Sequence, residues 1–341
     1  MDPHEPNPVH DPHDHHHEHE HDPHDATKHV DLILEGGGVK NVALLGAVIA
    51  LAEAGYTFPR VAGTSGGAII AAAVAAYVRA GLDLGGLVDA TVEVDNRRFT
   101  EYRKRGRIAG PLSGLADLFR DGGLHSSDYI NEILGPSLAK AGVETFGDLR
   151  IDDDHGTGLP NERRYSLVVH VSDLTRRVLV RLPWDYGDYG RDPDDQRVID
   201  AVQASMSIPF YFKPVKLPTT GGAVTWVDGG LLVNFPITTF DRTDGKPPRW
   251  PTWGVKVSSS PPLAPDRPVR GAFEVGKRCL QTLTGDWYRA WLVEEGAGRR
   301  TIMVDTSEIK STDFNLTKQD TWKLFENGRT AATQFLARLG E

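Results

Sequence analysis

The sequence predicts an α/β protein with a mostly parallel central sheet, and two neighbouring segments lead to this class. An apolar strand pattern at 30–34 continues through three glycines into a helical pattern that Gly55 closes. A second strand pattern, at 58–64, continues through a glycine turn into a helical pattern at 68–79. Two strand–turn–helix units within so short a stretch indicate parallel strands, whose carboxyl-terminal loops carry function.

The rest of the chain continues the alternation of strands and helices. We expect strands at 164–173, 178–182, 223–230, 251–258 and 300–306, and helices at 127–141, 198–205, 272–295 and 318–339. Thr317 and Asp320 form a capping pair for the last helix. Because no repeat or linker divides this region, we expect one domain over residues 30–341.

Composition excludes several classes of protein. A net charge of -9 argues against a nucleic-acid partner, because phosphate binding needs a concentrated basic surface. A single cysteine, Cys279, cannot form an internal disulfide, which suits a reducing compartment. The apolar runs at 42–54 and 68–78 are shorter than the ~20 residues that span a bilayer. With no signal-peptide pattern at the start, we expect a cytoplasmic protein that could still contact a membrane peripherally.

Residues 1–29 have a composition unlike the rest of the chain. They hold ten of the 13 histidines, repeated Asp-Pro pairs and almost no apolar side chains. Such a segment buries too little surface to fold, so we expect a disordered tail. An alternative is loose binding of divalent metals by histidines such as His15, His16 and His17, although no spacing typical of a structural zinc site is present.

Residues 63–67, "GTSGG", match the G-x-S-x-G pattern. In this pattern a strained strand-to-helix turn presents a serine hydroxyl to a cleft, which makes Ser65 a candidate nucleophile. The alternative is a tight glycine turn into a well-packed helix. The pattern alone does not decide between them in a chain with 36 glycines.

Gly36, Gly37 and Gly38 form a second glycine turn between a strand and a helix. The segment lacks the spacing of a phosphate-binding P-loop, and Asn41 stands where a dinucleotide fingerprint needs glycine. Two interpretations remain, a close strand–helix contact and an oxyanion hole made of backbone N–H groups. A nucleophile on the neighbouring turn favours the oxyanion hole.

A serine nucleophile needs a base, and histidine is an improbable one here. After the tail only His125, His155 and His170 remain, and all three precede Asp228, the acid that best ends a strand. This order differs from the Ser–acid–His order of α/β-hydrolases. An earlier acid paired with His170 stays formally open. Asp228 is the alternative base, although Asp-Gly is also a common hairpin turn.

Four segments in this order resemble the patatin-like phospholipase family: "EGGGVKN" at 35–41, "GTSGG" at 63–67, "ASMSIPFYFKPV" at 204–215 and "VDGGLLVNFPI" at 227–237. The likeness extends over nearly all of residues 30–339. It implies a three-layer α/β/α fold of the patatin-like type and a Ser-Asp dyad without histidine.

Carried over residue by residue, the resemblance implies that Ser65 is the nucleophile and Asp228 its proton acceptor. The Gly36–Gly38 loop, joined by the amide of Gly66, corresponds to the oxyanion hole, and Lys40 to its basic position. The family often has glycine where this chain has Asn41, which leaves the start of the first helix less defined.

The resemblance implies a serine esterase that hydrolyses acyl esters of phospholipids or lysophospholipids without metal or cofactor. The segment at 152–158 lacks the glutamate of a calcium-binding loop. An acyltransferase, or a catalytically silent protein that binds lipid or metal, remains an alternative. The basic and moderately apolar segment at 97–119 is either a lid that contacts lipid or an ordinary solvated insertion. Trp287 and Trp291 are expected to pack in the core.

Overall fold

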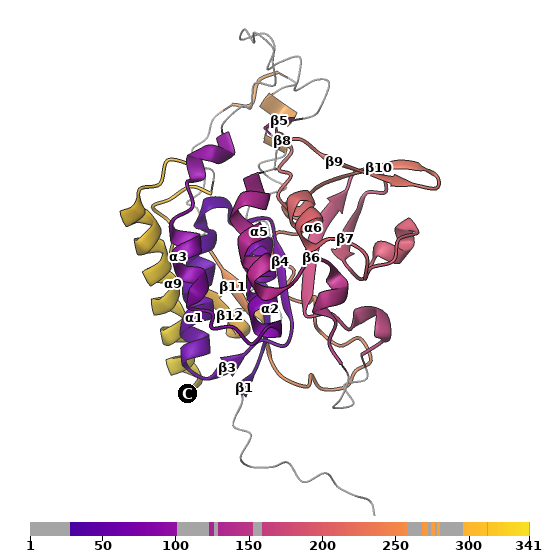
Figure 1. The fold of residues 1–341 in the computed structure, drawn as a ribbon. Coiled ribbons are helices and arrows are strands. Elements are labelled where there is room, and N and C mark those ends of the chain that lie inside the picture. Colours follow the sequence, from indigo (N-terminus) through magenta and orange to yellow (C-terminus); the bar gives the residue numbers. More distant parts are fainter. Residues whose placement is uncertain are drawn as a thin grey trace, which may run out of the picture.

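The computed structural model describes residues 28–100, 123–125, 129–152, 159–257, 268–271, 274–276, 278–279, 296–311 and 313–340 (Figure 1). Several predictions therefore fall outside the described residues. These are the tail with His15, His16 and His17, most of the segments 97–119 and 272–295 with Trp287 and Trp291, and the acidic loop at 153–158 with His155. In the part of the chain that is described, no helix is long and apolar enough to span a bilayer.

An eight-stranded sheet forms the centre of the molecule, in the order β12-β11-β2-β4-β6-β10-β9, with β7 also paired to β6. Its first five strands run parallel, and β7, β9 and β10 are antiparallel additions at the other side. The bounds are β2 (Asp31–Leu34), β4 (Val61–Thr64), β6 (Leu167–Asp173), β7 (Val178–Leu182), β9 (Val215–Thr219), β10 (Gly222–Asp228), β11 (Thr252–Lys256) and β12 (Thr301–Met303). The predicted, mostly parallel sheet is confirmed.

Helices pack against this sheet as the three-layer α/β/α prediction requires (Figure 1). Their bounds are α1 (Asn41–Glu53), α2 (Gly66–Arg79), α3 (Gly86–Val92), α5 (Tyr129–Ala141), α6 (Val198–Ser205) and α9 (Lys318–Leu339). Close approach of α1 and α9 depends on Gly46 and Gly328, since a Cβ at either position would lie 2.0 Å from a backbone oxygen of the other helix. The predicted capping box at Thr317 and Asp320 begins α9.

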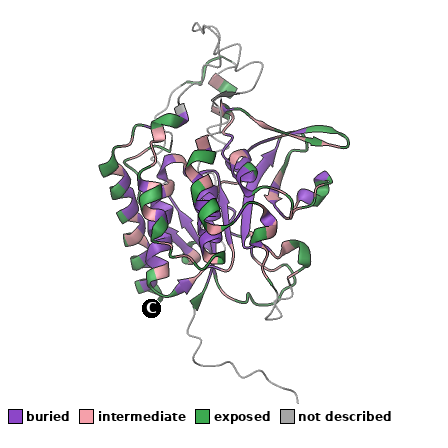
Figure 2. Cartoon of the chain, viewed as in Figure 1, coloured by how far each residue is buried: buried purple, intermediate pink, exposed green. Residues whose placement is uncertain are grey.

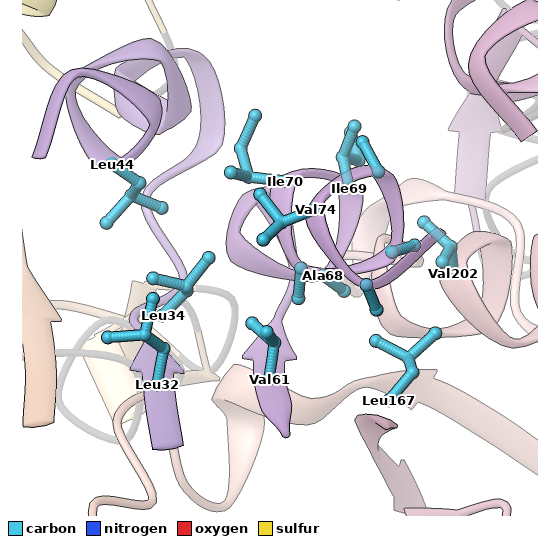
Figure 3. Close-up of a cluster of buried hydrophobic side chains, with 14 of the residues drawn as sticks. Leu32, Leu34, Leu44, Val61, Ala68, Ile69, Ile70, Val74, Leu167 and Val202 are labelled. Carbon is cyan, nitrogen blue, oxygen red and sulfur yellow. The ribbon is translucent and has the colours of Figure 1, made fainter. Parts of the chain in front are cut away.

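The core lies on both faces of the sheet, because strand side chains alternate between them. Leu32, Leu34 and Val61 face α1 and α2, where they meet side chains such as Val74 (Figure 3). Ile33 points to the opposite face and belongs to a second cluster with Phe235, Ile237 and Phe240, among others. Figure 2 shows the central strands as buried, whereas the β9–β10 hairpin and the outer faces of the helices are partly exposed.

Some elements differ from the sequence predictions. The second helix begins at Gly66 rather than 68, and a 3-10 turn at Gly38–Lys40 precedes α1. The pairs β1 (Lys28–His29) with β3 (Tyr56–Thr57) and β5 (Gly123–His125) with β8 (Phe210–Phe212) were not predicted, nor were α3 and β9, because short elements give little periodic signal. Asp228 does not sit in a hairpin turn, since β10 leads into a 3-10 turn at Gly229–Leu231.

Candidate active site

Ser65 occupies a strained turn between β4 and α2. Its backbone has φ 52° and ψ -127°, a conformation that a non-glycine residue adopts only when its surroundings enforce it. The flanking glycines explain why the turn is this tight. A Cβ on Gly63 would lie 2.4 Å from the Gly67 oxygen, and one on Gly67 would lie 2.5 Å from the Glu35 oxygen. The pattern therefore forms a strand–turn–helix elbow with serine at its apex.

The end of α6 holds this elbow in place. The Ser65 backbone N–H donates to Oγ of Ser205 at 2.8 Å, and the Ser205 hydroxyl donates to the His170 carbonyl at 2.7 Å. The next residue, Met206, has its Sδ 3.7 Å from Oγ of Ser65. These contacts fix the elbow relative to α6 and β6, and the two hydrogen bonds satisfy a buried donor and a buried acceptor.

Asp228 ends β10 in the same region and is 5% exposed. Its Oδ1 accepts a hydrogen bond from the Gly230 backbone N–H at 2.7 Å, and its own N–H donates to the Ser207 carbonyl. Burial raises the pKa of Asp228 to about 6, against the opposing influence of hydrogen bonding from the Ser65 side chain and the Gly230 amide. A carboxylate in this state is a much better base near neutral pH than a free aspartate.

The second carboxylate oxygen of Asp228 has no such hydrogen bond. Its Oδ2 is buried and has no hydrogen-bond partner of ordinary length among the described residues. The Ser65 hydroxyl is near enough to influence the carboxyl group, yet it contacts Met206 instead of closing a short bond to Oδ2. Catalytic hydrogen bonds are commonly longer in the free enzyme than in its complexes, so a rotation of the hydroxyl is what the arrangement requires.

The glycine loop lies against the elbow. A Cβ on Gly36 would lie 3.2 Å from Cβ of Ser65, and one on Gly66 would lie 2.9 Å from the Gly38 nitrogen. Gly38 itself has φ 54°, which favours glycine. Among the described residues, no hydrogen bond occupies the backbone N–H groups of Gly37, Gly38 and Gly66. The two turns therefore bring free donors together.

Gly36 differs from the expectation that its amide also points at the site. Its N–H donates to the Asn234 backbone oxygen at 3.1 Å, and the Asn234 side-chain amide donates to the Gly36 oxygen at 2.8 Å. This reciprocal pair ties the loop to the segment that follows Asp228. Gly36 is consequently a spacer that lets the loop reach Ser65, and its amide is already used.

Lys40 is buried in the 3-10 turn after the loop and is 6% exposed. Burial lowers its pKa, while attraction from Glu35 and Asp305 opposes the change. Glu35 forms a buried ion pair with Lys256 and also accepts the Val257 N–H. Lys40 thus stands beside a charged cluster that anchors the loop to β11.

His170 is not a base for Ser65. It is fully buried in β6, and its two ring nitrogens lie 3.2 Å from the Gly63 oxygen and 3.0 Å from Oγ1 of Thr239, with no carboxylate bonded to either. Burial lowers its pKa to about 4, so the ring is neutral above pH 5. The alternative of an earlier acid paired with His170 is wrong, because one ring nitrogen contacts the Gly63 carbonyl of β4 and the other contacts the Thr239 hydroxyl.

Sequence reasoning missed Ser205, Met206 and Asn234. The first two lie in the segment at 204–215 that carries part of the family resemblance, but no pattern in it indicates which side chain holds the elbow. Asn234 follows the Asp-Gly-Gly turn by a few residues and carries no motif of its own. All three act through contacts with residues that are distant in the sequence.

A strained serine elbow, a buried aspartate without a histidine and a glycine loop together form a candidate serine hydrolase site at the carboxyl ends of the parallel strands. A family model described as patatin-like phospholipase matches residues 32–241, and the chain belongs to this family. Members are lipid acyl hydrolases in general, and the fold and family predictions are thereby confirmed.

Two further comparisons found similar proteins. The chain is 34% identical over 308 residues to the uncharacterized protein YqhO of Bacillus subtilis (strain 168), which covers 90% of this chain and 98% of that protein. Among solved structures, VipD from Legionella pneumophila is similar in fold, with a TM-score of 0.52 and 21% identity over 91% of this chain and 67% of VipD.

Proposed function

We propose that the protein is a serine esterase that hydrolyses acyl esters of phospholipids or lysophospholipids through a Ser65–Asp228 dyad. The observation that carries this proposal is the buried Asp228 carboxyl group, which has an unpartnered oxygen and a raised pKa beside the Ser65 elbow. An aspartate that only forms a turn is not expected to be buried in this way, because a buried acceptor without a hydrogen bond lowers the stability of the fold by about 1–3 kcal/mol.

In the proposed reaction Oγ of Ser65 attacks the ester carbonyl carbon while Oδ2 of Asp228 accepts the hydroxyl proton. The carbonyl oxygen becomes an oxyanion, for which the free amides of Gly37, Gly38 and Gly66 are the candidate donors. The C–O bond to the alcohol then breaks, and the alcohol leaves with the proton held by Asp228. Water attacks the acyl-enzyme, gives its proton to Asp228, and the carboxylic acid departs as Ser65 regains its hydroxyl proton.

Lipid as the substrate class rests on family membership. One further feature supports peripheral contact with a lipid surface. Phe210 follows the α6 end that holds Ser65, is 56% exposed, and has φ 66°, which is unfavourable for a bulky side chain. An exposed aromatic ring on a strained backbone, shortly after the helix whose end holds Ser65, suits insertion among lipid head groups.

The first test compares wild type with Ser65→Ala and Asp228→Asn on a medium-chain p-nitrophenyl ester and on phospholipid mixed micelles, with a chelator throughout. We expect both variants to lose at least ~1000-fold in kcat, as removal of a serine hydrolase nucleophile does. Ser207→Ala, at a buried position, serves as a matched control, because among the described residues the Ser207 hydroxyl bonds only the carbonyl of Gln203 in α6.

Each alternative gives a different result. Near-normal activity of Asp228→Asn would show that another group deprotonates Ser65. If the wild type lost its activity in the presence of the chelator, the proposal that the reaction needs no metal would be wrong. Stimulation by an added alcohol with formation of a new ester would identify an acyltransferase, and a wild type inactive on every ester would indicate a silent lipid- or metal-binding protein.

A further inference from the structure

A cavity lies at the end of β4 opposite to Ser65. It has a volume of about 220 Å³, and its lining includes Arg60, Arg163, Trp184, Phe240 and Trp250. Arg60 immediately precedes β4, whereas Ser65 follows the carboxyl end of the same strand. The cavity is therefore separated from the candidate active site by the length of a strand.

The lining is basic although the chain as a whole is acidic. Four arginines and two aspartates face the cavity, which leaves a surplus of two positive charges against a net charge of -9 for the whole chain. Arg60 is paired with the buried Asp31, and Asp241 is paired with Arg300. Arg163 forms no ion pair with any carboxylate among the described residues. Within the part of the chain that the structure describes, this cationic group therefore has no carboxylate counter-charge.

Aromatic rings form the other half of the lining. The guanidinium of Arg163 lies 5.4 Å from the Trp184 ring centre, and that of Arg60 lies 4.5 Å from the Phe240 ring centre. Trp184 and Phe240 meet edge to face at 6.0 Å. The Trp184 Nε1 is a buried donor with no acceptor among the described residues. The cavity combines flat apolar surfaces with guanidinium groups.

Size and chemistry together restrict the ligand. A dry protein cavity of ~150 Å³ is enough to bind benzene, so the present volume accommodates one aromatic ring with a small substituent. Guanidinium groups match the planar geometry of a carboxylate better than any other anion-binding side chain. We propose that this cavity binds a small aromatic carboxylate, with its ring against Trp184 and its charge at Arg163. The proposal is independent of the hydrolase reaction.

The test is calorimetric titration of the full-length protein with benzoate, benzyl alcohol and acetate at pH 7.5. We expect benzoate to bind at least tenfold more tightly than either partial ligand, since charge and ring both contribute. Arg163→Gln should weaken benzoate binding about tenfold or more, as loss of a charge-assisted hydrogen bond does. Arg197→Gln removes an exposed arginine outside the cavity and should bind benzoate like wild type.

Two further measurements place the bound ligand. Benzoate should shift the indole N–H resonance of Trp184, assigned with Trp184→Phe, because the aromatic ring of the ligand lies against that side chain. Ser65→Ala should bind benzoate with unchanged affinity. Equal affinity for benzoate and benzyl alcohol, an unchanged affinity in Arg163→Gln, or loss of binding in Ser65→Ala would each overturn the proposal, the last by placing the ligand at the active site.

Discussion

Replacing Asp228 with asparagine should abolish hydrolysis and at the same time stabilise the fold. The change is nearly isosteric. The amide oxygen can keep the hydrogen bond from the Gly230 N–H, and the amide nitrogen takes the place of the unpartnered Oδ2. The variant therefore removes a buried charge without breaking a contact, and the wild-type protein carries the cost of that charge at neutral pH.

The magnitude follows from the pKa of Asp228, which burial raises from 3.8 to about 6. Below pH 3.8 the group is protonated in both the folded and the unfolded state, and its contribution to stability is fully present. As the pH rises through 6, the unfolded state ionises first and stability is lost. The complete loss is about 3 kcal/mol, of which about 1.4 kcal/mol falls between pH 5 and pH 8.

The assay is urea unfolding of wild type and Asp228→Asn at pH 5 and pH 8. We expect the free energy of unfolding of the variant, relative to wild type, to increase by about 1.4 kcal/mol between the two pH values. Asp89→Asn, at an exposed position on α3, controls for general charge effects and should show no such increase. A difference that is the same at pH 5 and pH 8 would refute the reasoning that Asp228 is ionised at a cost.

Four other outcomes follow from the site. The kcat/KM of wild type should rise with pH through about 6 as Asp228 ionises, and His170→Gln should show the same rise. If the rise were absent in His170→Gln, His170 would be the group that titrates in catalysis. Ser205→Ala leaves the Ser65 N–H without its acceptor, so kcat should fall about 5- to 150-fold, whereas Ser207→Ala should stay near wild type. Gly66→Ala places a Cβ 2.6 Å from the Gly38 oxygen and should reduce kcat at least tenfold with correct folding retained by circular dichroism. Phe210→Ser should reduce hydrolysis of vesicles several-fold but leave hydrolysis of a soluble ester unchanged; equal loss on both would argue against a role at the lipid surface.

The sequence was sufficient for features that depend on neighbours along the chain. The elbow at 63–67 and the capping pair at Thr317 are local patterns, and each specifies its own geometry. The contacts that complete the site could not be predicted in this way. Ser205 is 140 residues from Ser65, and Asn234 is 198 residues from Gly36. Their pairing depends on strand order, which periodicity does not encode.

The oxyanion assignment shows the same limit within a single motif. Three adjacent glycines look equivalent in the sequence, yet the amide of Gly36 donates to the Asn234 carbonyl, while those of Gly37 and Gly38 have no partner among the described residues. Which amide is free depends on a segment that reaches the loop only in the folded protein. A glycine pattern therefore predicts that a loop can present donors, but not which of them it presents.

The strand order also bears on when a newly made chain becomes able to act. β2, near the start, lies between β4 and β11, and β11 follows Asp228 in the sequence. A nascent chain that ends soon after Asp228 holds both reactive side chains, yet it lacks the strand that covers the edge of β2 and the helix α9 that packs on α1. We expect such a fragment to be unable to complete the glycine loop. We therefore expect activity to appear only after α9 has left the ribosome.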